Sequence, residues 1–582
     1  MRSLRRGGRR SRPRVGPPLT ALVLCAASLA LAAPAQADTA TATGTSTGAA
    51  TSTGTVAGPG TGDGTAKPRI IGGRPTESLF KPWIVQLIYQ PGTASAEFCG
   101  GTAISPTKIL TAGHCVAGRD WARHGMVVVG SATTGPSPAS TEMKVHAQWL
   151  APGYRPTASG LTVDNDLAIL TLDRPVSVHF RAYGWQSPLP GSGAGAGPVT
   201  VYGWGNTDST PGSSNQGVSL QRIDVDGVPD RTCADVLATA TGDPQAFVPG
   251  HMLCVGAGGT GDDTTGRTAC VGDEGDPVVE TPNGLLVGVI SHLGVRTSTQ
   301  DCNVPGTYDV VTNFGNYVAD VAAQLSNSDV TRDGKADILA RTPAGRSYLY
   351  ASTGTGYKSR VAAPISLSNY DTVVQDDFDR DGHQDFVLRA KGTGNVFLAR
   401  RSVNSATYKY TRIGSHWGGV KAIVSRSSLG YADSLPHLLV EDSSGRLWSY
   451  GILWNGSFQK PTPLHGNWQR YNAVVGRGDF TGDTKGDVLA RDARTGNLYL
   501  LPGTIANPTI PYLPPLLISG GWNRYDKLIS PGDYDGDGHP DLLARVPSGS
   551  LYLFRGTGRT GSETLAAPVR IGAGWNAYNG LS

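Results

Sequence analysis

The sequence predicts an all-β protein with two domains, and three observations lead to that prediction. Of the 582 residues, 79 are glycine and 16% are charged, a composition that favours frequent turns over long helices. Short β-like runs such as WIVQLIY, MVVVG and LLVGVI extend from Ile70 to about Ala323, separated by Gly/Pro turns, which fits a barrel or sandwich. After residue 325, a unit of about 50 residues recurs five times. The one helix that we expect lies around Asn316–Leu325.

The first 37 residues read as a secretory signal peptide. Seven arginines and no acid lie in Met1–Arg14, an apolar run covers Leu19–Ala33, and Ala35-Gln36-Ala37 gives a small-x-small cleavage site. The apolar run is too short to span a bilayer, so we expect no stable membrane anchor, and the route, Sec or Tat, stays open. Residues 38–69 are rich in Thr, Ala and Gly and predict a disordered linker or pro-segment.

The charge and the cysteines are those of an exported protein. The net charge of +4 includes the seven arginines of the signal peptide, so the mature chain is near −3 and shows no basic patch for nucleic acid. Six cysteines remain after the signal peptide, all of them before residue 303, and an even number in an exported chain predicts disulfides. We therefore expect a secreted, extracellular protein, and by default a monomer. The six are Cys99, Cys115, Cys233, Cys254, Cys270 and Cys302.

The repeats in residues 325–582 predict a β-propeller. Aligning Asp337, Asp385, His437, Asp487 and Asp541 gives spacings near 50 residues, and each unit reads loop, strand, turn, strand. The sequence stops at GWNAYNGLS, a landmark that precedes later loops, whereas the first unit starts without that landmark. The last residues can therefore supply the missing strand of the first blade and close a ring of five. An open solenoid is the alternative.

Four of the five repeat loops carry acids at alternating positions. Oxygen ligands at loop positions 1, 3, 5 and 9, often with Gly at 6, suit Ca²⁺, and the alternative is a solvated acidic turn. The third loop, LGYADSLPH, has lost most ligands and is expected to be empty, and the threonines at position 3 predict weaker sites in the first and fourth loops. The expected ligands are Asp329, Thr331, Asp333 and Asp337; Asp377, Asp379, Asp381 and Asp385; Asp479, Thr481, Asp483 and Asp487; and Asp533, Asp535, Asp537 and Asp541.

Three motifs in the first domain supply parts of a serine-protease site. TAGHC offers His114, DNDLAIL offers Asp166 before an apolar strand, and CVGDEGDP offers a Gly-rich turn. Nucleophilic proteolysis needs a base, a carboxylate that orients it, and N–H donors for the oxyanion. The order His, Asp, turn is that of the chymotrypsin class.

With IIGG at Ile70–Gly73, GWG at Gly203–Gly205 and VPGTYDVV at Val304–Val311, residues 70–323 resemble the trypsin/chymotrypsin-like peptidases. The resemblance implies a double β-barrel and the disulfides Cys99–Cys115, Cys233–Cys254 and Cys270–Cys302. Residues 325–582 resemble FG-GAP/VCBS repeats of secreted and cell-surface proteins, a resemblance that says little about the ligand.

The resemblance also implies roles for single residues. His114 matches the general base, Asp166 its orienting carboxylate, and Ser291 the serine that supports that carboxylate. The N–H groups of Gly272 and residue 274 match the oxyanion hole. Cleavage after Arg69 would free an Ile70 amine to pair with Asp273, as in a zymogen. The specificity pocket would contain Thr268, Ser291, Leu293 and Gly306.

The sequence departs from the family at the residues that matter most for catalysis. Glu274 stands in place of the nucleophilic serine, Thr268 in place of the Asp at the floor of a trypsin pocket, Leu293 in place of a Gly on its wall, and Asp276 in place of the second Gly of G-D-S-G-G-P. We predict that the Glu274 carboxylate either pairs with His114 or folds into the oxyanion hole. Either arrangement would disable the site, because the carboxylate places negative charge there and favours the imidazolium.

The sequence therefore predicts a pseudoprotease joined to a calcium-binding propeller. Its partner would be an extracellular protein, a peptide or a cell-envelope glycan. The alternatives are an active secreted endopeptidase, and an adhesin in which the propeller is the functional part. The propeller tryptophans could line sugar-binding surfaces, but their recurrence in the GW and NW landmarks favours packing.

Overall fold

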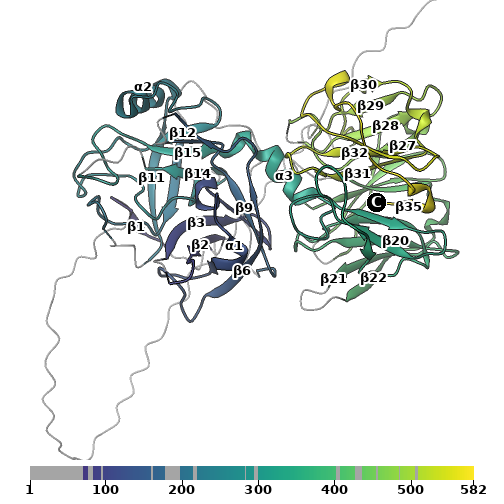
Figure 1. Cartoon of the computed structure of the whole chain (residues 1–582), viewed down its shortest axis with the longest axis horizontal. Helices are drawn as coiled ribbons and strands as arrows, with labels where there is room; N and C mark the ends of the chain where they lie inside the picture. The colour runs from purple at the N-terminus through teal and green to yellow at the C-terminus, as the bar shows by residue number, and fades with distance from the viewer. Residues whose placement is uncertain are drawn as a thin grey trace, which may run out of the picture. The chain divides into compact units, whose positions relative to one another are not determined.

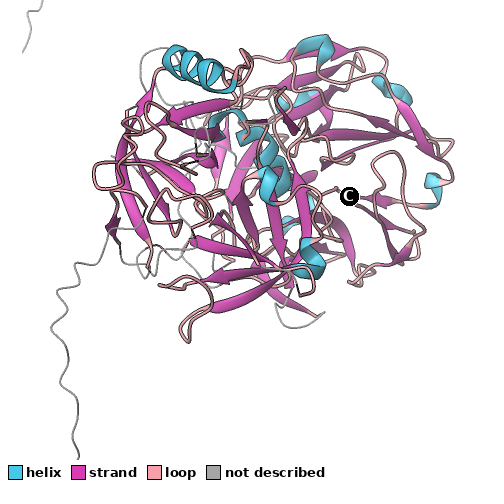
Figure 2. Ribbon diagram, turned by 60° about the vertical axis from the view of Figure 1, so that its left-hand side comes forward, coloured by secondary structure: helices cyan, strands magenta, loops and turns pink. Residues whose placement is uncertain are grey.

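Strands dominate the part of the chain that the computed structural model describes (Figures 1 and 2). The described residues are 70–582, without 77–80, 82, 94–95, 159–161, 177–196, 214–218, 282–283, 294–298, 402–406, 427–434, 454–455, 484 and 505–508. The predicted signal peptide, the linker and Arg69 lie outside them. Among the described residues, no helix is long and apolar enough to cross a membrane.

The first domain contains two barrels, which confirms the double-barrel prediction. In the first barrel, strands pair in the closed order β2-β3-β4-β9-β6-β5, and the pairing of β2 with β5 completes the ring. These strands are β2 (Ile84–Tyr89), β3 (Glu97–Ala103), β4 (Lys108–Thr111), β5 (Gly125–Val129), β6 (Thr141–Leu150) and β9 (Ala168–Leu172). A small hairpin of β7 (Arg155–Pro156) and β8 (Val163–Asp164) precedes β9.

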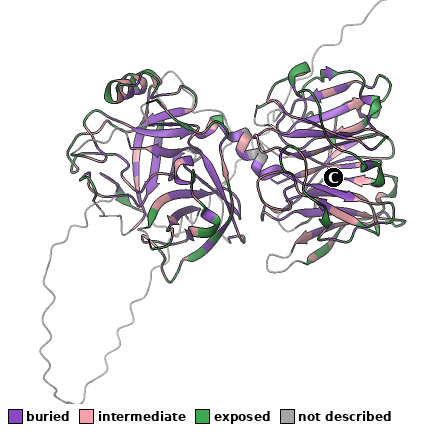
Figure 3. Ribbon diagram, in the orientation of Figure 1, coloured by how far each residue is buried: buried purple, intermediate pink, exposed green. Residues whose placement is uncertain are grey.

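The second barrel has the order β11-β10-β13-β14-β15-β12, and an additional pairing of β11 with β12 closes it. Its strands are β10 (Pro198–Gly203), β11 (Gln221–Val228), β12 (Met252–Val255), β13 (Pro277–Glu280), β14 (Leu286–His292) and β15 (Asp309–Asn313). The short β1 (Arg74–Pro75) adds to β11 at the outside. Buried faces of the strands form the cores of both barrels (Figure 3).

Three α-helices occur in the described part of the first domain. The expected helix near its end is present as α3 (Val318–Ser326), whereas α1 (Trp121–His124) and the longer α2 (Asp230–Thr241) were not expected. Helix α2 ends where Gly242 adopts a left-handed φ of 70°, the conformation that glycine tolerates best at a helix end. Its apolar side buries Cys233 and Leu237, and the Cys233–Cys254 disulfide links it to β12.

All six cysteines are paired as the resemblance implies. The disulfides are Cys99–Cys115, Cys233–Cys254 and Cys270–Cys302. The first links β3 to the turn that carries His114, and the third lies directly before the Gly-rich turn. Two of the three therefore anchor segments of the candidate active site.

The second domain is a five-bladed propeller, as predicted, with five antiparallel four-stranded sheets among its described residues. The strands of the first two blades are β16 (Ile338–Arg341), β17 (Ser347–Tyr350), β18 (Val361–Ala362) and β35 (Gly580–Leu581), then β19 (Tyr370–Asp376), β20 (Asp385–Ala390), β21 (Val396–Arg401) and β22 (Tyr408–Gly414). Those of the third and fourth are β23 (Ala422–Arg426), β24 (His437–Glu441), β25 (Leu447–Gly451) and β26 (Thr462–Leu464), then β27 (Tyr471–Val475), β28 (Val488–Asp492), β29 (Leu498–Leu501) and β30 (Leu516–Ser519). The fifth has β31 (Lys527–Gly532), β32 (Asp541–Arg545), β33 (Leu551–Phe554) and β34 (Val569–Gly572).

The last strand of the chain completes the first blade. In β35, Gly580 and Leu581 pair with Arg341 and Ala340 of β16, and Ser582 exchanges two backbone hydrogen bonds with Leu339. The first and last repeats therefore share one sheet, which confirms the predicted ring closure.

Arginines on the second strand hold four of the five blade junctions. Arg389 donates to the carbonyls of Trp417 (3.2 Å) and Val420 (2.6 Å) in the turn that leads to the next blade. At their own junctions, Arg341, Arg491 and Arg545 each donate to two backbone carbonyls. The third blade has Glu441 at this position of the register. Trp468, Trp522 and Trp575 of these turns are buried, as packing residues would be.

Candidate active site and candidate metal loops

His114 lies in a short 3-10 turn, Gly113–Cys115, directly after β4, and is joined to Asp166 by two hydrogen bonds. Its ring Nδ1–H donates to Asp166 Oδ2 at 2.8 Å, and its backbone N–H donates to Asp166 Oδ1 at 2.7 Å. Asp166 is fully buried between β8 and β9. The structure therefore brings together the predicted base and its orienting carboxylate in a fixed geometry.

Ser291 supports the same carboxylate from the second barrel. Strand β14 shifts its register between Ile290 and His292, an irregularity of the kind that re-aims a side chain. The Ser291 hydroxyl donates to Asp166 Oδ2 at 2.6 Å, and the Thr312 hydroxyl donates to the Asp166 carbonyl at 2.8 Å. Donors from both barrels thus hold Asp166 in place.

These contacts favour a charged dyad. Burial opposes the charged form of His114, but the attraction and hydrogen bond of Asp166 outweigh it, and with a further contribution from Glu274 the His114 pKa is raised. Burial also opposes ionisation of Asp166, yet His114, His292 and Ser291 together hold its pKa below the usual range. The arrangement therefore stabilises an imidazolium beside a carboxylate.

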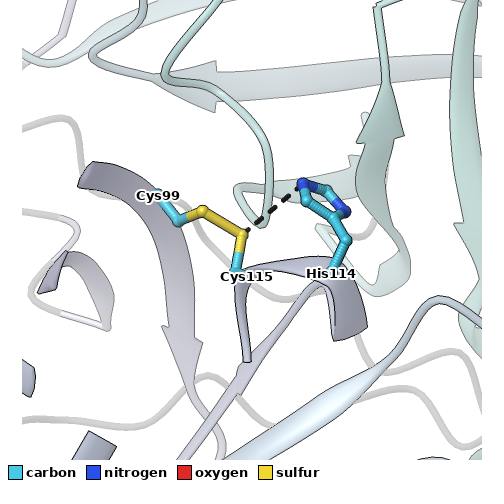
Figure 4. Close-up of side chains that lie close together, drawn as sticks. All are labelled: Cys99, His114 and Cys115. Atoms are coloured by element: carbon cyan, nitrogen blue, oxygen red, sulfur yellow. Dashed lines mark hydrogen bonds between the residues drawn. A yellow bond between two sulfur atoms is a disulfide. The ribbon is translucent and has the colours of Figure 1, made fainter. Parts of the chain in front are cut away.

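Two further groups contact the His114 ring, and the sequence did not single out either of them. Its Nε2 lies 3.7 Å from the sulfur of Cys115, within the Cys99–Cys115 disulfide (Figure 4). The ring of His292 stacks on the His114 ring, with 5.4 Å between centroids and 23° between planes. His292 directly follows Ser291 in β14, and nothing in its sequence context indicated this contact.

Glu274 lies in the position expected of the nucleophile, and its carboxylate accepts a hydrogen bond from the backbone N–H of Gly272 at 2.7 Å. This contact fits the second arrangement predicted for Glu274, while the charge of Glu274 also acts on His114. The turn keeps its shape because Gly272 and Gly275 adopt φ values of 100° and 88°, which favour glycine. A Cβ on Gly275 would also lie 2.3 Å from the carbonyl oxygen of Gly100.

Two further acids, Asp273 and Asp276, are fully buried beside this turn. Asp273 accepts hydrogen bonds from the N–H groups of Gly205 (2.6 Å) and Cys270 (2.9 Å), yet burial raises its pKa to about 8. A Cβ on Gly203 would lie 2.0 Å from Asp273 Oδ1 and 2.7 Å from Asp276 Oδ2, so the two carboxylates are close neighbours in a glycine-lined recess.

Of these two acids, Asp276 has the poorer hydrogen bonding. Within the described part of the chain, no donor makes a full hydrogen bond to either of its carboxyl oxygens, although the Trp204 amide lies near enough to favour the charged form. Burial and the charges of Asp273 and Glu274 raise the Asp276 pKa well above its usual value. The sequence showed Asp276 as a departure from the family but not as a buried, poorly paired acid.

Ile70 and Thr268, predicted for activation and specificity, lie beside the strands of the second barrel. Ile70 is fully buried and the Ile71 carbonyl accepts from the Thr268 N–H at 3.2 Å. The Thr268 hydroxyl donates to Asp309 Oδ1 at 2.6 Å, and burial raises the Asp309 pKa to about 7. Nothing in the sequence singled out Asp309.

Leu293, predicted for the pocket wall, is 4% exposed, and Gly306 has a φ of 75°. The segment that follows Leu293, residues 294–298, lies outside the described residues.

The predicted metal loops place carboxylates close together in three blades. Ligand atoms lie within 4.8 Å of one another in three groups, Asp377, Asp379 and Asp385; Asp479, Asp483 and Asp487; and Asp533, Asp535 and Asp537. The described first loop has no such group, although Asp329 and Asp337 accept backbone N–H groups of Gly334 (2.8 Å) and Thr331 (2.9 Å) as their counterparts in other loops do. Most of the third loop lies outside the described residues.

The second loop fits a cation best. Asp377 Oδ1 and Asp379 Oδ1 are buried there with no hydrogen-bond partner among the described residues. Burial and mutual repulsion raise the pKa values of Asp377 and Asp385 well above the usual range. Each of the three loops also has a cationic side chain beside it. Arg400 contacts Asp379 Oδ2 at 3.3 Å in the second loop, Lys485 contacts Asp483 Oδ2 at 2.9 Å in the fourth, and Arg555 contacts Asp535 Oδ2 at 2.5 Å in the fifth. The orphaned oxygens of Asp377 and Asp379 are therefore what sets the second loop apart.

Comparison with known proteins divides the chain in the same way. The family described as trypsin matches residues 70–321, the FG-GAP-like repeat family matches 329–388 and 479–544, and the FG-GAP repeat family matches 528–562. A trypsin of Saccharopolyspora erythraea is 31% identical over 263 residues, covering 44% of the chain and 98% of that trypsin. Trypsin zeta of Drosophila melanogaster is 30% identical, covering 44% of the chain and 87% of that protein.

Among solved structures, the chain is similar to the scabies mite inactivated protease paralogue S-D1. The two share 24% sequence identity with a TM-score of 0.35, and the match covers 43% of this chain and 95% of the other.

Proposed function

Because the chain belongs to the trypsin family, we propose that its first domain keeps the family's binding framework but has little or no peptidase activity. The observation that supports this proposal is the 2.7 Å hydrogen bond from the Gly272 N–H to the Glu274 carboxylate. That N–H corresponds to a donor that must bind the oxyanion of the transition state. A resident carboxylate satisfies the donor and places negative charge where the oxyanion would develop.

The state of His114 supports the same proposal. Its raised pKa favours the imidazolium, which has no lone pair on Nε2 with which to accept a proton. Glu274 contributes to that raised pKa and has no hydroxyl to be deprotonated. The dyad is thus retained in geometry, while the group that it would activate is missing.

We further propose that the protein is secreted and that the first domain captures an extracellular protein or peptide. Three disulfides within the first domain and a leader-like first segment support an oxidising destination. Cleavage after Arg69 would free an Ile70 amine, which the family resemblance pairs with the buried Asp273. Burial raises the pKa of Asp273 to about 8, and no cationic side chain contacts it among the described residues of the recess. On this proposal, His114→Ala leaves peptide capture unchanged.

The test is hydrolysis of an activated ester by the chain before and after cleavage at Arg69. We expect the wild-type rate to equal the uncatalysed rate. Glu274→Ser should raise it about 10³-fold or more, because loss of the nucleophile costs another serine protease about 10⁶ in turnover. A serine variant as slow as the wild type would show that Glu274 is not the residue that limits catalysis.

Glu274→Gln is the matched control, because it removes the charge without supplying a nucleophile. It should remain inactive, but it should lower the His114 pKa measured by NMR, since the Glu274 charge helps to raise that pKa. Wild-type turnover together with labelling by an active-site serine reagent would establish the alternative, an active endopeptidase. Binding of envelope glycans by the propeller alone would favour the adhesin alternative.

We also propose that the propeller binds calcium, with the second loop as the strongest site. Asp377, Asp379, Asp381 and Asp385 would hold the ion, and the orphaned oxygens of Asp377 and Asp379 support this assignment. A bound divalent cation would offset the repulsion that raises the pKa values of these acids. Its role would be structural, because four acids in one short loop repel one another without it.

Thermal melting with and without a chelator tests the calcium proposal. We expect chelation to lower the Tm of the propeller by roughly 5–10 °C, since a ligand at 100 times its Kd adds about 2.7 kcal/mol of stability. Asp385→Asn should reduce this dependence, whereas Glu563→Gln, at an exposed acid of the same domain, should leave it intact. An unchanged Tm on chelation would contradict the proposal.

A further inference from the structure

One end of the propeller channel is lined by residues that the repeat places at equivalent positions. The second strand of each blade carries the junction residue described above, which is arginine in four blades and Glu441 in the third. One residue of the inner strand pairs with that junction residue. These residues, which we call the rim positions, are Thr372, Ala422, Ala473, Lys527 and Gly580. Four of them are small, so Lys527 is the one long side chain among them.

The residues that directly precede the rim positions are polar, and most of them have partners. Arg389 Nε contacts Asp371 Oδ1 at 2.7 Å, and Arg545 holds both carboxyl oxygens of Asp526. Lys421 lies 3.6 Å from Glu441. The acids next to the rim are therefore already neutralised by cations of their own blades.

Lys527 and Arg341 are not neutralised in this way. Within the described part of the chain, no acceptor forms a hydrogen bond or ion pair with the half-buried Lys527 ammonium. Among the described residues, Arg341 donates only to the backbone carbonyls of Tyr370 and Asp371. Burial lowers the Arg341 pKa, and the charge of Asp371, which is itself paired with Arg389, opposes that effect without forming an ion pair with Arg341. The Arg341 guanidinium lies against Gly580, because a Cβ there would be 3.2 Å from Arg341 Nε.

The two cations are also near each other. Burial, and then the positive charge of Arg545, lower the Lys527 pKa, with Arg341 adding to the effect and Asp526 opposing it. Two like charges in a partly desolvated position raise the free energy of the empty site, and a bound anion would relieve that repulsion.

A cavity of about 230 Å³ lies beside them. Among its lining side chains, Arg341, Lys421 and Lys527 are cationic and Asp371 is acidic, while Leu339, Leu367, Val373 and Ile423 supply an apolar wall. A water molecule takes up about 30 Å³, so the space suits a small molecule rather than a single water or ion. A second cavity of about 340 Å³ shares Val373, Ile423 and Lys527 with it and continues along the inner strands.

We propose that this rim of the propeller channel binds the oxyanion of a small molecule, a carboxylate or a phosphate. Lys527 and Arg341 would supply the charged contacts, and Thr372 and Asn579 the neutral ones. The apolar wall would contact the body of the ligand. A guanidinium fork and an ammonium are the groups that proteins use for such oxyanions. This site is separate from the calcium loops, since none of their acids lines the cavity.

Calorimetric titration at constant ionic strength tests the proposal on the full chain. The probes are glucuronate, glucose 6-phosphate and neutral glucose, which have the same ring and differ in the oxyanion. We expect binding of at least one acidic probe and none of glucose. Lys527→Met should weaken that binding about tenfold or more, and the preferred acid identifies the oxyanion.

Lys409→Met is the matched control, because Lys409 is exposed on the outer strand β22 and does not line the cavity. It should bind like the wild type. Failure of both acidic probes to bind would overturn the proposal, as would equal binding of glucose or unchanged affinity in Lys527→Met. Circular dichroism of Lys527→Met should match the wild type, since the other four rim positions tolerate short side chains.

Discussion

The Gly-rich turn around Glu274 in the first domain and the third blade of the second domain each depart from a pattern that surrounding residues keep. In the turn, Glu274 and Asp276 stand where the resemblance expects a serine and a glycine, while His114 keeps its contact with Asp166 and Gly272 contacts Glu274. In the third blade, Glu441 takes the place of the junction arginine. The residue before the rim position is an acid or an amide in the other blades and Lys421 here. Lys421 and Glu441 therefore form an ion pair with the charges exchanged between the two strands.

The two regions differ in whether the residue that contacts the exchanged one has been exchanged as well. An exchange in a fixed frame changes the electrostatics around it. Burial opposes the charged form of His114, Asp166 outweighs that effect, and the Glu274 charge raises the His114 pKa further. A reciprocal exchange leaves the local net charge unchanged and conserves the contact. Substituting a residue that was exchanged without its partner should therefore change stability strongly. Substituting both members of an exchanged pair should change it little.

The largest effect on stability should come from breaking an intact blade junction. Arg389→Met removes hydrogen bonds to the carbonyls of Trp417 and Val420 and the ion pair with Asp371. Because hydrogen bonds to a charged group are worth about 1.5–3 kcal/mol, we expect a loss of about 2–3 kcal/mol, measured by calorimetry of the propeller transition. Arg412→Met, at an exposed arginine of the same blade, should change it little. Equal losses in both variants would contradict the role given to Arg389.

An intermediate effect is expected at Asp276, a second exchange in the Gly-rich turn. Asp276→Asn should stabilise the uncleaved chain by about 1–2 kcal/mol at pH 8, since a tenfold difference in proton affinity between the folded and unfolded states corresponds to about 1.4 kcal/mol. The measurement is the Tm of the first domain as a function of pH.

The sign follows from the raised pKa of Asp276. The folded state retains its proton above about pH 4, where the unfolded chain has lost it, so the stability of the wild type falls as pH rises towards the folded pKa. Asp276→Asn should show a shallower fall over that range, and Asp273 and Asp309, with pKa values of about 8 and about 7, should contribute to what remains. Parallel pH profiles in the two proteins would show that Asp276 is ionised or well solvated.

The smallest effect is expected for the exchanged pair of the third blade. Lys421→Asp or Glu441→Arg alone should cost about 0.5–1 kcal/mol, because Lys421 is half exposed and such pairs are weak. The double variant should return to within about 0.5 kcal/mol of the wild type in a double-mutant cycle. Additive losses would mean that Lys421 and Glu441 act independently of each other.

Much of the fold could be predicted because its signals are local and repeated. The His114, Asp166 and Gly-rich motifs occur in a fixed order, and the period near 50 residues, with a landmark left over at the end, predicted both five blades and the closure by β35. The two arrangements considered for Glu274 followed from charge alone. The hydrogen bond from the Gly272 N–H depends on the shape of the folded turn, which charge alone does not predict.

Other features depend on contacts between distant residues. The stacking of His292 on His114 arises where a bulged strand of the second barrel meets the turn after β4. The neighbours of Asp276 come from the turn around Gly203, and the partner of Thr268 is Asp309, on another strand. Helix α2 was missed because its polar, threonine-rich sequence has weak helix propensity and is held by a disulfide to β12.

The closure of the first blade has a consequence for the order in which the propeller can form. Strand β16 receives its inner neighbour only when Gly580 and Leu581 become available, more than 230 residues later in synthesis. The blade that is made first is therefore the last to be completed, while each of the other four blades can assemble from contiguous sequence. Until then the inner edge of β16 has unpaired backbone groups, the kind of exposed strand edge that recruits other chains. Each newly made molecule passes through this vulnerable interval, and its length depends on how quickly the final residues reach β16.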